Sequence, residues 1–320
     1  MLTSIELCAG AGGQALGLEQ AGFQHRALVE LEPAYCRTLQ LNRPNWNVIA
    51  SDLNEFDARP YSGVDLVAAG LPCPPFSKAG KQLGAGDERN LFPAALRIIE
   101  EVQPGAVLIE NVRGFLDAVF EDYRVHLRGQ LARLGYWSEW KLLNAADFGV
   151  PQLRPRVAIV ALRRGLHEGF RWPEAYTRAP SVGEALEDLM AANGWRGARF
   201  WANRASDIAP TLVGGSLKHG GPDLGPTRAR QAWAALGVEG RTLANEPPEP
   251  NFTGMPRLTV RMAARIQGFP DDWAFAGGKT VSYRQVGNAF PPPVARALGV
   301  AIRDALNRAY GWENKIGCAG

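Results

Sequence analysis

Short apolar runs alternate with segments of helical periodicity along the first half of the chain. Continuous apolar runs are typical of buried strands, whereas apolar residues that recur every three or four positions are typical of helices. The predicted strands cover residues 4–8, 26–29, 65–69, 106–109 and 157–162, and the predicted helices cover residues 13–21, 33–41 and 91–102. This alternation predicts an α/β fold with a doubly wound sheet.

The pattern changes after about residue 165. Gly, Pro, Trp and Arg are frequent between residues 165 and 255, which favours a second domain that is smaller and rich in loops. Helical periodicity returns at residues 259–267 and 293–307. We therefore expect a first domain at residues 1–164, a loop-rich domain at 165–257, and a return segment at 258–320 that completes the first domain.

Composition and charge limit the classes of protein to consider. The 320 residues, 46% of them hydrophobic, suffice for a full core. Neither a signal peptide nor an apolar segment of membrane-spanning length is evident, so we expect a cytoplasmic protein. The net charge is +3, but residues 151–270 carry 16 Lys and Arg against 10 Asp and Glu. Such a basic region suits a polyanionic partner, and it also suits an ordinary solvated surface.

One cysteine stands in an unusual context. The four cysteines are scattered and form neither a disulfide framework nor a CxxC metal pattern, so we expect a reducing compartment and no metal. Cys73 lies between prolines in the segment GLPCPPFS at residues 70–77, directly after an apolar run. Ligands bind at the carboxyl ends of parallel strands, where a thiol can act as a nucleophile. A thiol that serves packing explains this segment alone equally well.

A glycine turn follows the first predicted strand. It reads Ala-Gly-Ala-Gly-Gly at residues 9–13 and leads into a helix, which allows a ligand to approach the backbone closely. Glu30 ends the second strand, near where a ribose-binding carboxylate is expected. Asp52 follows the apolar run 47–50 and could accept a hydrogen bond from an adenine amino group. This arrangement is compatible with NAD and with S-adenosylmethionine.

Taken together, these segments strongly resemble the cytosine-5 DNA methyltransferase family. The resemblance covers nearly the whole chain, and the family's motifs occur in their usual order. Six segments carry it: the glycine turn at residues 9–13; Gly70, Pro72, Cys73, Phe76 and Ser77; Glu110, Asn111 and Val112; Gln152, Arg154 and Arg156; residues 267–270; and Gly287 with Asn288. The resemblance implies a Rossmann-like, S-adenosylmethionine-dependent methyltransferase sheet with a smaller target-recognition domain.

The implied reaction transfers a methyl group to carbon 5 of cytosine. This carbon becomes nucleophilic when a thiolate adds to carbon 6, and Cys73 would supply the thiolate. Glu110 would pair with ring nitrogen 3 and the exocyclic amine of the base. Arg156 would contact the base carbonyl, and Arg154, on the same strand face, would hold the loop or a phosphate. Without the resemblance, Glu110 is equally a helix-capping acid and both arginines are solvated.

The resemblance also assigns residues to the cofactor. Asn288 would lie near the cofactor carboxylate, where the return segment reaches the first domain. The expected S-adenosylmethionine-binding residues are Cys8, Ala9, Gly10, Gly12, Gly13, Glu30, Leu31, Asp52, Leu53, Gly70, Pro72, Leu91 and Asn288.

The implied partner is double-stranded DNA, bound by a monomer. The target carbon is unreachable inside a duplex, so the nucleotide has to be flipped out. Residues 77–91 resemble a loop that closes over the flipped base, and base reading is expected around residues 190–230. The expected DNA-binding residues are Ser77, Lys78, Lys81, Arg89, Arg196, Arg199, Thr211, Leu212 and Lys218, with His219 beside them. Whether a cognate restriction endonuclease accompanies the enzyme stays open.

Two positions depart from the family pattern. Cys8 replaces a phenylalanine whose ring normally packs on the adenine, so either the stacking is weakened or a neighbour such as Leu31 supplies it. Pro74 replaces the glutamine that usually follows the nucleophile, which puts the detail of that loop in doubt.

Three other functions remain as alternatives. A cytosine-5 tRNA methyltransferase shares the fold and nucleophile, but its usual Cys-Phe-Thr signature is absent. An NAD-dependent oxidoreductase would explain the glycine turn and Glu30, but not Cys73 and Glu110. A non-catalytic DNA-binding regulator would not need these two residues.

Overall fold

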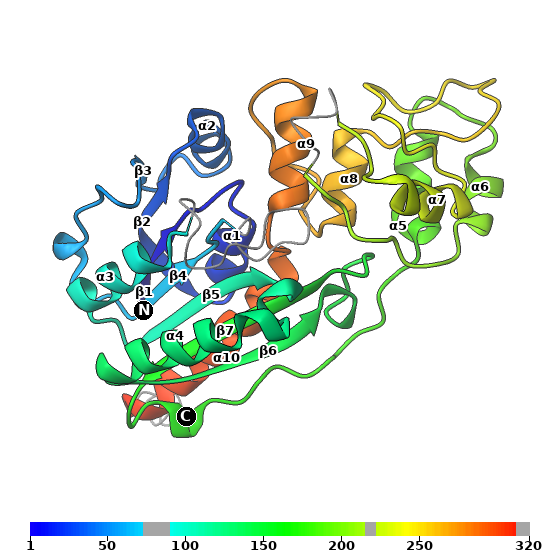
Figure 1. The fold of residues 1–320 in the computed structure, drawn as a ribbon. Helices are drawn as coiled ribbons and strands as arrows, with labels where there is room; N and C mark the ends of the chain where they lie inside the picture. The colour runs from blue at the N-terminus through cyan, green and yellow to red at the C-terminus, as the bar shows by residue number, and fades with distance from the viewer. Residues whose placement is uncertain (73–89, 215–221, 312–320) are drawn as a thin grey trace, which may run out of the picture.

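The computed structural model describes residues 1–72, 90–214 and 222–311, which form a larger and a smaller lobe (Figure 1). The larger lobe is built on a sheet with the strand order β3-β2-β1-β4-β5-β7-β6. The strands are β1 (Leu2–Leu7), β2 (Phe23–Glu30), β3 (Val48–Ala50), β4 (Leu66–Ala69), β5 (Ala106–Val112), β6 (Tyr136–Asn144) and β7 (Pro155–Arg163). The first five run parallel, and β7 is antiparallel to both of its neighbours. The predicted α/β fold is confirmed.

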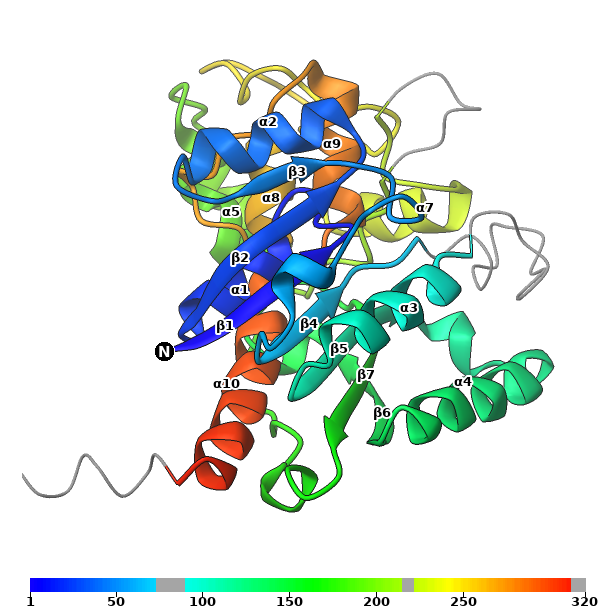
Figure 2. The ribbon, with the colours of Figure 1, turned by 90° about the vertical axis from the view of Figure 1, so that its left-hand side faces the viewer.

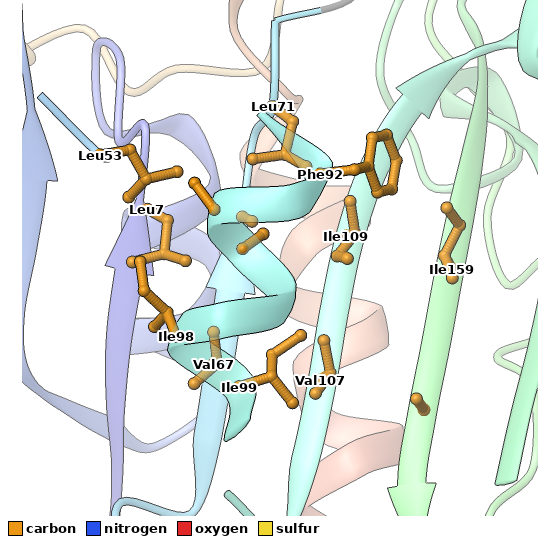
Figure 3. Packing of buried hydrophobic residues seen from close by; sticks show 14 of the residues in the cluster. Leu7, Leu53, Val67, Leu71, Phe92, Ile98, Ile99, Val107, Ile109 and Ile159 are labelled. Atoms are coloured by element: carbon orange, nitrogen blue, oxygen red, sulfur yellow. The ribbon is translucent and has the colours of Figure 1, made fainter. Parts of the chain in front are cut away.

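Helices cover both faces of the sheet (Figure 2). On one face lie α3 (Phe92–Val102) and α4 (Glu121–Arg133), and on the other lie α1 (Gly13–Gln20) and α10 (Pro292–Ala309). Figure 3 shows Ile98 and Ile99 of α3 against Val67 and Val107 of the sheet. Because successive strand side chains point to opposite faces, the sheet contributes to two separate cores.

The contact between α1 and α10 depends on two glycines. A Cβ atom at Gly17 would lie 2.4 Å from the carbonyl oxygen of Pro292, and one at Gly299 would lie 2.7 Å from the Cβ of Ala21. Neither distance is sterically possible without a shift of the backbone. The close approach attaches the last helix to the first and brings the chain back onto the sheet.

The core of the smaller lobe includes four tryptophans and Tyr283, and it extends to Ala11 and Leu16 of the larger lobe. Its helices are α5 (Val182–Ala191), α6 (Ala198–Arg204), α7 (Thr227–Ala235), α8 (Val260–Ile266) and α9 (Lys279–Asn288), and α2 (Pro33–Asn42) of the larger lobe lies beside α9 (Figure 1). Thr38 of α2 donates to Gln285 Oε1 of α9 at 2.6 Å. Helices α8 and α9 belong to the expected return segment 258–320, and they share a core with α5 of the expected loop-rich domain. The domain limits drawn from the sequence stay a prediction.

Several elements were not anticipated from the sequence pattern. Helix α4 is mostly polar and buries few side chains, and β6 is a half-exposed edge strand, so neither has an apolar run. The region expected to be rich in loops contains α5, α6 and α7, whose short lengths give weak periodicity. Among the described residues, every helix is too short or too polar to cross a membrane.

Candidate active site

The carboxyl ends of β1, β2, β4 and β5 meet at one edge of the sheet. Leu7 pairs with Ala69, and Ala69 pairs with Ile109, so three neighbouring strands reach this edge at the same level. The next residues along the three chains are Cys8, Gly70 and Glu110. Because ligands of open α/β sheets bind outside this edge, it is the candidate active site.

The turn after β1 requires glycine. Gly10 and Gly12 have φ angles of 57° and 82°, which residues other than glycine rarely adopt. A Cβ atom at Gly12 would lie 2.7 Å from the side chain of Leu39. The Gly10 N–H donates to Glu30 Oε2 at 2.7 Å, so the carboxyl group at the end of β2 fixes the turn.

Four predicted cofactor residues surround this turn in different environments. Cys8 is half-buried, and burial raises the pKa of its thiol to about 12, so the thiol stays protonated and is a poor nucleophile. Leu31 is 59% exposed, which leaves its side chain available to a ligand. Leu53 is buried in the core. Asp52 accepts the Asn54 N–H at 2.8 Å, so its carboxylate is held beyond β3.

The other predicted cofactor residues of the larger lobe lie along the same edge. Ala9 and Gly13 belong to the turn, Gly70 donates its N–H to the Leu7 oxygen at 3.1 Å, Pro72 is exposed, and Leu91 immediately precedes α3. The structure therefore brings together residues that are far apart in the sequence.

Glu110 and Arg156 form an ion pair at this edge. Arg156 Nε lies 2.7 Å from Glu110 Oε1, and both side chains are largely buried. Burial raises the pKa of Glu110, although the positive charges of Arg156 and Arg154 act in the opposite direction. A carboxyl group in this environment can hold a proton more readily than an exposed one.

Arg154 is held by main-chain groups, and the expectation that it holds the loop or a phosphate stays a prediction. It precedes β7 and is fully buried. Its guanidinium donates to the carbonyl oxygens of Leu212 at 2.8 Å, Gly287 at 2.7 Å and Ala289 at 3.1 Å. Arg156 faces Glu110, whereas Arg154 binds main-chain groups of the smaller lobe and the segment that follows it.

The Thr-Leu pair expected to take part in DNA recognition is anchored within the protein. The Leu212 side chain is buried, and its N–H donates to Gln152 Oε1 at 2.8 Å. Thr211 Oγ1 donates to the Leu153 oxygen at 2.6 Å. These contacts hold the segment in place, so a direct contact with bases stays a prediction.

Asn288 lies at the end of α9 and is exposed. A Cβ atom at Gly214 would lie 2.2 Å from Asn288 Oδ1, and one at Gly287 would lie 2.5 Å from the backbone of Gly214. The end of α9 therefore touches the segment that follows Leu212. A contact of Asn288 with the cofactor stays a prediction.

The predicted arginines of the recognition region lie at the outer end of the smaller lobe. Arg199 belongs to α6, which Figure 1 shows far from the sheet, and Arg196 precedes it. Arg199 Nη1 lies 3.5 Å from Glu187 Oε1. Their part in DNA binding stays a prediction. The predictions for Cys73, Pro74, Ser77, Lys78, Lys81, Arg89, Lys218 and His219 lie outside the described residues.

Three buried polar residues near the site were not singled out as ligands or catalysts. Glu6 Oε2, both side-chain polar atoms of Gln14, and Asn111 Nδ2 have no hydrogen-bond partner among the described residues. Burial raises the pKa of Glu6 well above its usual value. A glutamate within a strand expected to be buried was the signal for Glu6. Within the described ranges, no group of three or more His, Cys, Asp or Glu could hold a metal ion.

Comparison with known families gives a consistent result. The model of the C-5 cytosine-specific DNA methylase family matches residues 2–304. The Type II methyltransferase M.NgoMIV of Neisseria gonorrhoeae is 55% identical over 316 residues, which cover 96% of this chain and 98% of the relative. The Type II methyltransferase M.NaeI of Lentzea aerocolonigenes is 54% identical over 312 residues, which cover 96% of this chain and 76% of the relative.

Solved structures share the fold. A DNMT2 variant of Spodoptera frugiperda superposes with a TM-score of 0.68 at 20% sequence identity, over 95% of this chain and 100% of that one. A DNA modification methyltransferase encoded within an Escherichia coli prophage gives a TM-score of 0.67 at 22% identity, over 96% of this chain and 100% of that one.

Proposed function

Because the chain belongs to the C-5 cytosine-specific DNA methylase family, we propose that it transfers a methyl group from S-adenosylmethionine to a flipped cytosine in duplex DNA, with Cys73 as nucleophile. The observation that supports this most directly is the buried Glu110–Arg156 pair, which lies at the sheet edge beside the strand that leads to Cys73. Since two relatives that are more than 50% identical over the aligned residues are Type II methyltransferases, the substrate is proposed to be a specific site protected from a cognate endonuclease.

The chemistry explains why a thiol stands beside a carboxyl group. The Cys73 thiolate adds to carbon 6 of cytosine, and the electron pair released in the ring makes carbon 5 nucleophilic. After carbon 5 is methylated, it loses its proton and the thiolate leaves, which restores the aromatic ring. Cysteine suits both steps because its thiolate is reactive and also a competent leaving group.

Glu110 and Arg156 have complementary tasks in this proposal. A carboxyl group with a raised pKa can donate a proton to ring nitrogen 3 as negative charge builds up during thiolate addition. The ion pair with Arg156 fixes the orientation of the carboxyl group, and the remaining guanidinium donors can reach the base carbonyl.

The residues at the edge fit the cofactor. The glycine turn allows close approach, and a Cβ atom at Gly70 would lie 3.3 Å from the Cys8 oxygen, so the space between the ends of β1 and β4 stays narrow. Glu30 would bind the ribose hydroxyls and Asp52 the adenine amine. When bound, S-adenosylmethionine supplies an electrophilic methyl group; the protein orients it and excludes water.

Methyl transfer to nucleic acid tests the proposal. Wild type, Cys73→Ala and the matched control Cys318→Ala, near the end of the chain, would be incubated with labelled S-adenosylmethionine and either duplex DNA or tRNA. We expect label in DNA with wild type and the control, and none with Cys73→Ala. Label in tRNA alone would favour the tRNA methyltransferase instead. Thermal melts that respond to NAD and not to S-adenosylmethionine would exclude the proposed cofactor.

A further inference from the structure

The chain before β7 holds two distant segments together. Residues 151–154 run beside residues 209–212: the Leu153 N–H donates to the Ala209 oxygen at 2.8 Å, and the Ala209 N–H donates to the Pro151 oxygen at 3.1 Å. Gln152 and Arg154 then extend these contacts with their side chains. Residues 209–212, which lie within the expected recognition region, are thus docked against the residues immediately before β7, the strand that carries Arg156.

Arg154 joins this segment to the end of α9. Its two terminal nitrogens reach the carbonyl oxygens of Leu212 on one side and of Gly287 and Ala289 on the other. Gln152 Nε2 adds hydrogen bonds to the Ile266 oxygen at 3.2 Å and to Gln267 Oε1 at 2.7 Å. The side chains of Gln152 and Arg154 therefore bind three stretches of chain, at residue 212, at residues 266–267 and at residues 287–289.

The geometry requires an arginine. A fully buried cation is costly unless its donors are satisfied, and the planar guanidinium fork can serve several fixed acceptors at once. A lysine ammonium would place a single donor group where the arginine spans carbonyls on two segments. The cost of removing a charge from water offsets much of the energy gained from its hydrogen bonds, so Arg154 adds little net stability. Its main effect is to fix the relative positions of the segments that it binds.

Resting on the proposed function, we propose that Arg154 is a positioning residue that couples target recognition to catalysis. It fixes residues 209–214 and the end of α9 against the start of β7, and Arg156 follows two positions later in the same strand. A displacement of the recognition segment on an incorrect DNA site is thereby transmitted to Arg156 and its partner Glu110. Arg154 itself does not need to touch DNA or cofactor.

The test compares Arg154→Lys with Arg124→Lys. Arg124 is a matched control because it is also buried and donates to two carbonyl oxygens, of Phe115 at 2.6 Å and Asp117 at 2.9 Å, but it lies in α4. Single-turnover methylation, the Kd for DNA, and the rate ratio between cognate and singly altered sites would be measured. For Arg154→Lys we expect a rate loss of about 100-fold, a lower ratio and an unchanged Kd; for Arg124→Lys, rate and ratio as in wild type.

A milder variant keeps the test informative if Arg154→Lys does not fold. Thr211→Val removes the hydrogen bond to the Leu153 oxygen from a half-buried position, and we expect a single-turnover rate loss of about 10-fold at saturating DNA. Because Thr211 is also an expected DNA-binding residue, the Kd for DNA is not a readout for this variant. Hydrogen exchange gives a readout that needs no activity: peptides that cover residues 209–214 should exchange faster in Arg154→Lys than in Arg124→Lys.

Two results would overturn the inference. One is equal rates and equal site discrimination in the Arg154 and Arg124 variants, together with unchanged exchange at residues 209–214. The other is a loss confined to the Kd for DNA, which would make Arg154 part of the binding surface. If wild type shows no methylation of DNA but residues 209–214 exchange faster in Arg154→Lys, the proposed function is contradicted. The positioning of residues 209–214 by Arg154 is then still supported.

Discussion

Arg156 Nε on β7 lies 2.7 Å from Glu110 Oε1 on β5, across the antiparallel pair that these two strands form. Because β7 runs against β5, a residue near the start of one strand meets a residue near the end of the other. Residues 209–212 dock just before Arg156, and Cys73 follows β4, the strand next to Glu110, in the sequence. The ion pair therefore lies between the recognition residues 209–212 on one side and the strand that precedes Cys73 on the other.

Replacement of Glu110 by glutamine should slow methylation strongly. The amide keeps the shape but cannot donate a carboxyl proton, so the single-turnover rate should fall by about 10²–10⁴-fold. Glu101→Gln is the matched control, since Glu101 also pairs with an arginine, Arg97, at 2.8 Å on the surface of α3. Equal rates for the two variants would remove Glu110 from the mechanism.

Replacement of Glu30 by glutamine should weaken cofactor binding. The amide oxygen can still accept from Gly10, but the amide nitrogen replaces the second oxygen, which accepts the Glu32 N–H at 2.8 Å and would also accept from a ribose hydroxyl. Calorimetry should show a Kd for S-adenosylmethionine that is higher by about 10-fold, equivalent to about 1.4 kcal/mol. Glu32→Gln, an exposed neighbour, should bind as wild type does; a similar loss there would point to a general charge effect.

The buried carboxyl group of Glu6 should make stability depend on pH. Its pKa in the folded protein lies well above the usual 4.5 because of burial, so its contribution to stability is fully present below pH 4.5 and is lost as the pH rises through the folded value. Glu6→Gln removes this loss. Relative to wild type, the variant should gain stability progressively as the pH rises above 4.5.

Urea unfolding of wild type and Glu6→Gln at a series of pH values measures this difference. We expect the difference in unfolding free energy between Glu6→Gln and wild type to grow from acid to neutral pH. A difference that is constant with pH would mean that Glu6 does not titrate in this range.

Two glycines in helices should respond oppositely to alanine. At Gly17 a Cβ atom would collide with the Pro292 oxygen at 2.4 Å, so Gly17→Ala should destabilise the protein by about 1–3 kcal/mol. At Gly129, in the exposed face of α4, no atom lies within 4 Å, so Gly129→Ala should stabilise by about 0.5–1 kcal/mol. The denaturant midpoints of the two variants and wild type measure these changes. If Gly129→Ala also lowered the midpoint, the space around Gly129 would not be open.

The sequence allowed a correct prediction of β1, β4 and β5 and of the second half of β2, because these residues are largely buried in the sheet. It did not reveal β6 or α4, whose exposed polar residues give no such signal. Arg154 was grouped with Arg156 because the two are spaced as on one strand face. The main-chain carbonyl groups that its guanidinium contacts lie 58 to 135 positions away, and no local pattern encodes them.

Covalent trapping on duplex DNA that contains 5-fluorocytosine tests the central claim most directly. Fluorine at carbon 5 cannot leave as the proton does, so the adduct between Cys73 and carbon 6 should persist after methyl transfer. With S-adenosylmethionine, wild type should give a denaturation-resistant complex of protein and DNA, and Cys73→Ala should give none. Equal behaviour of the two proteins would contradict nucleophilic catalysis by Cys73.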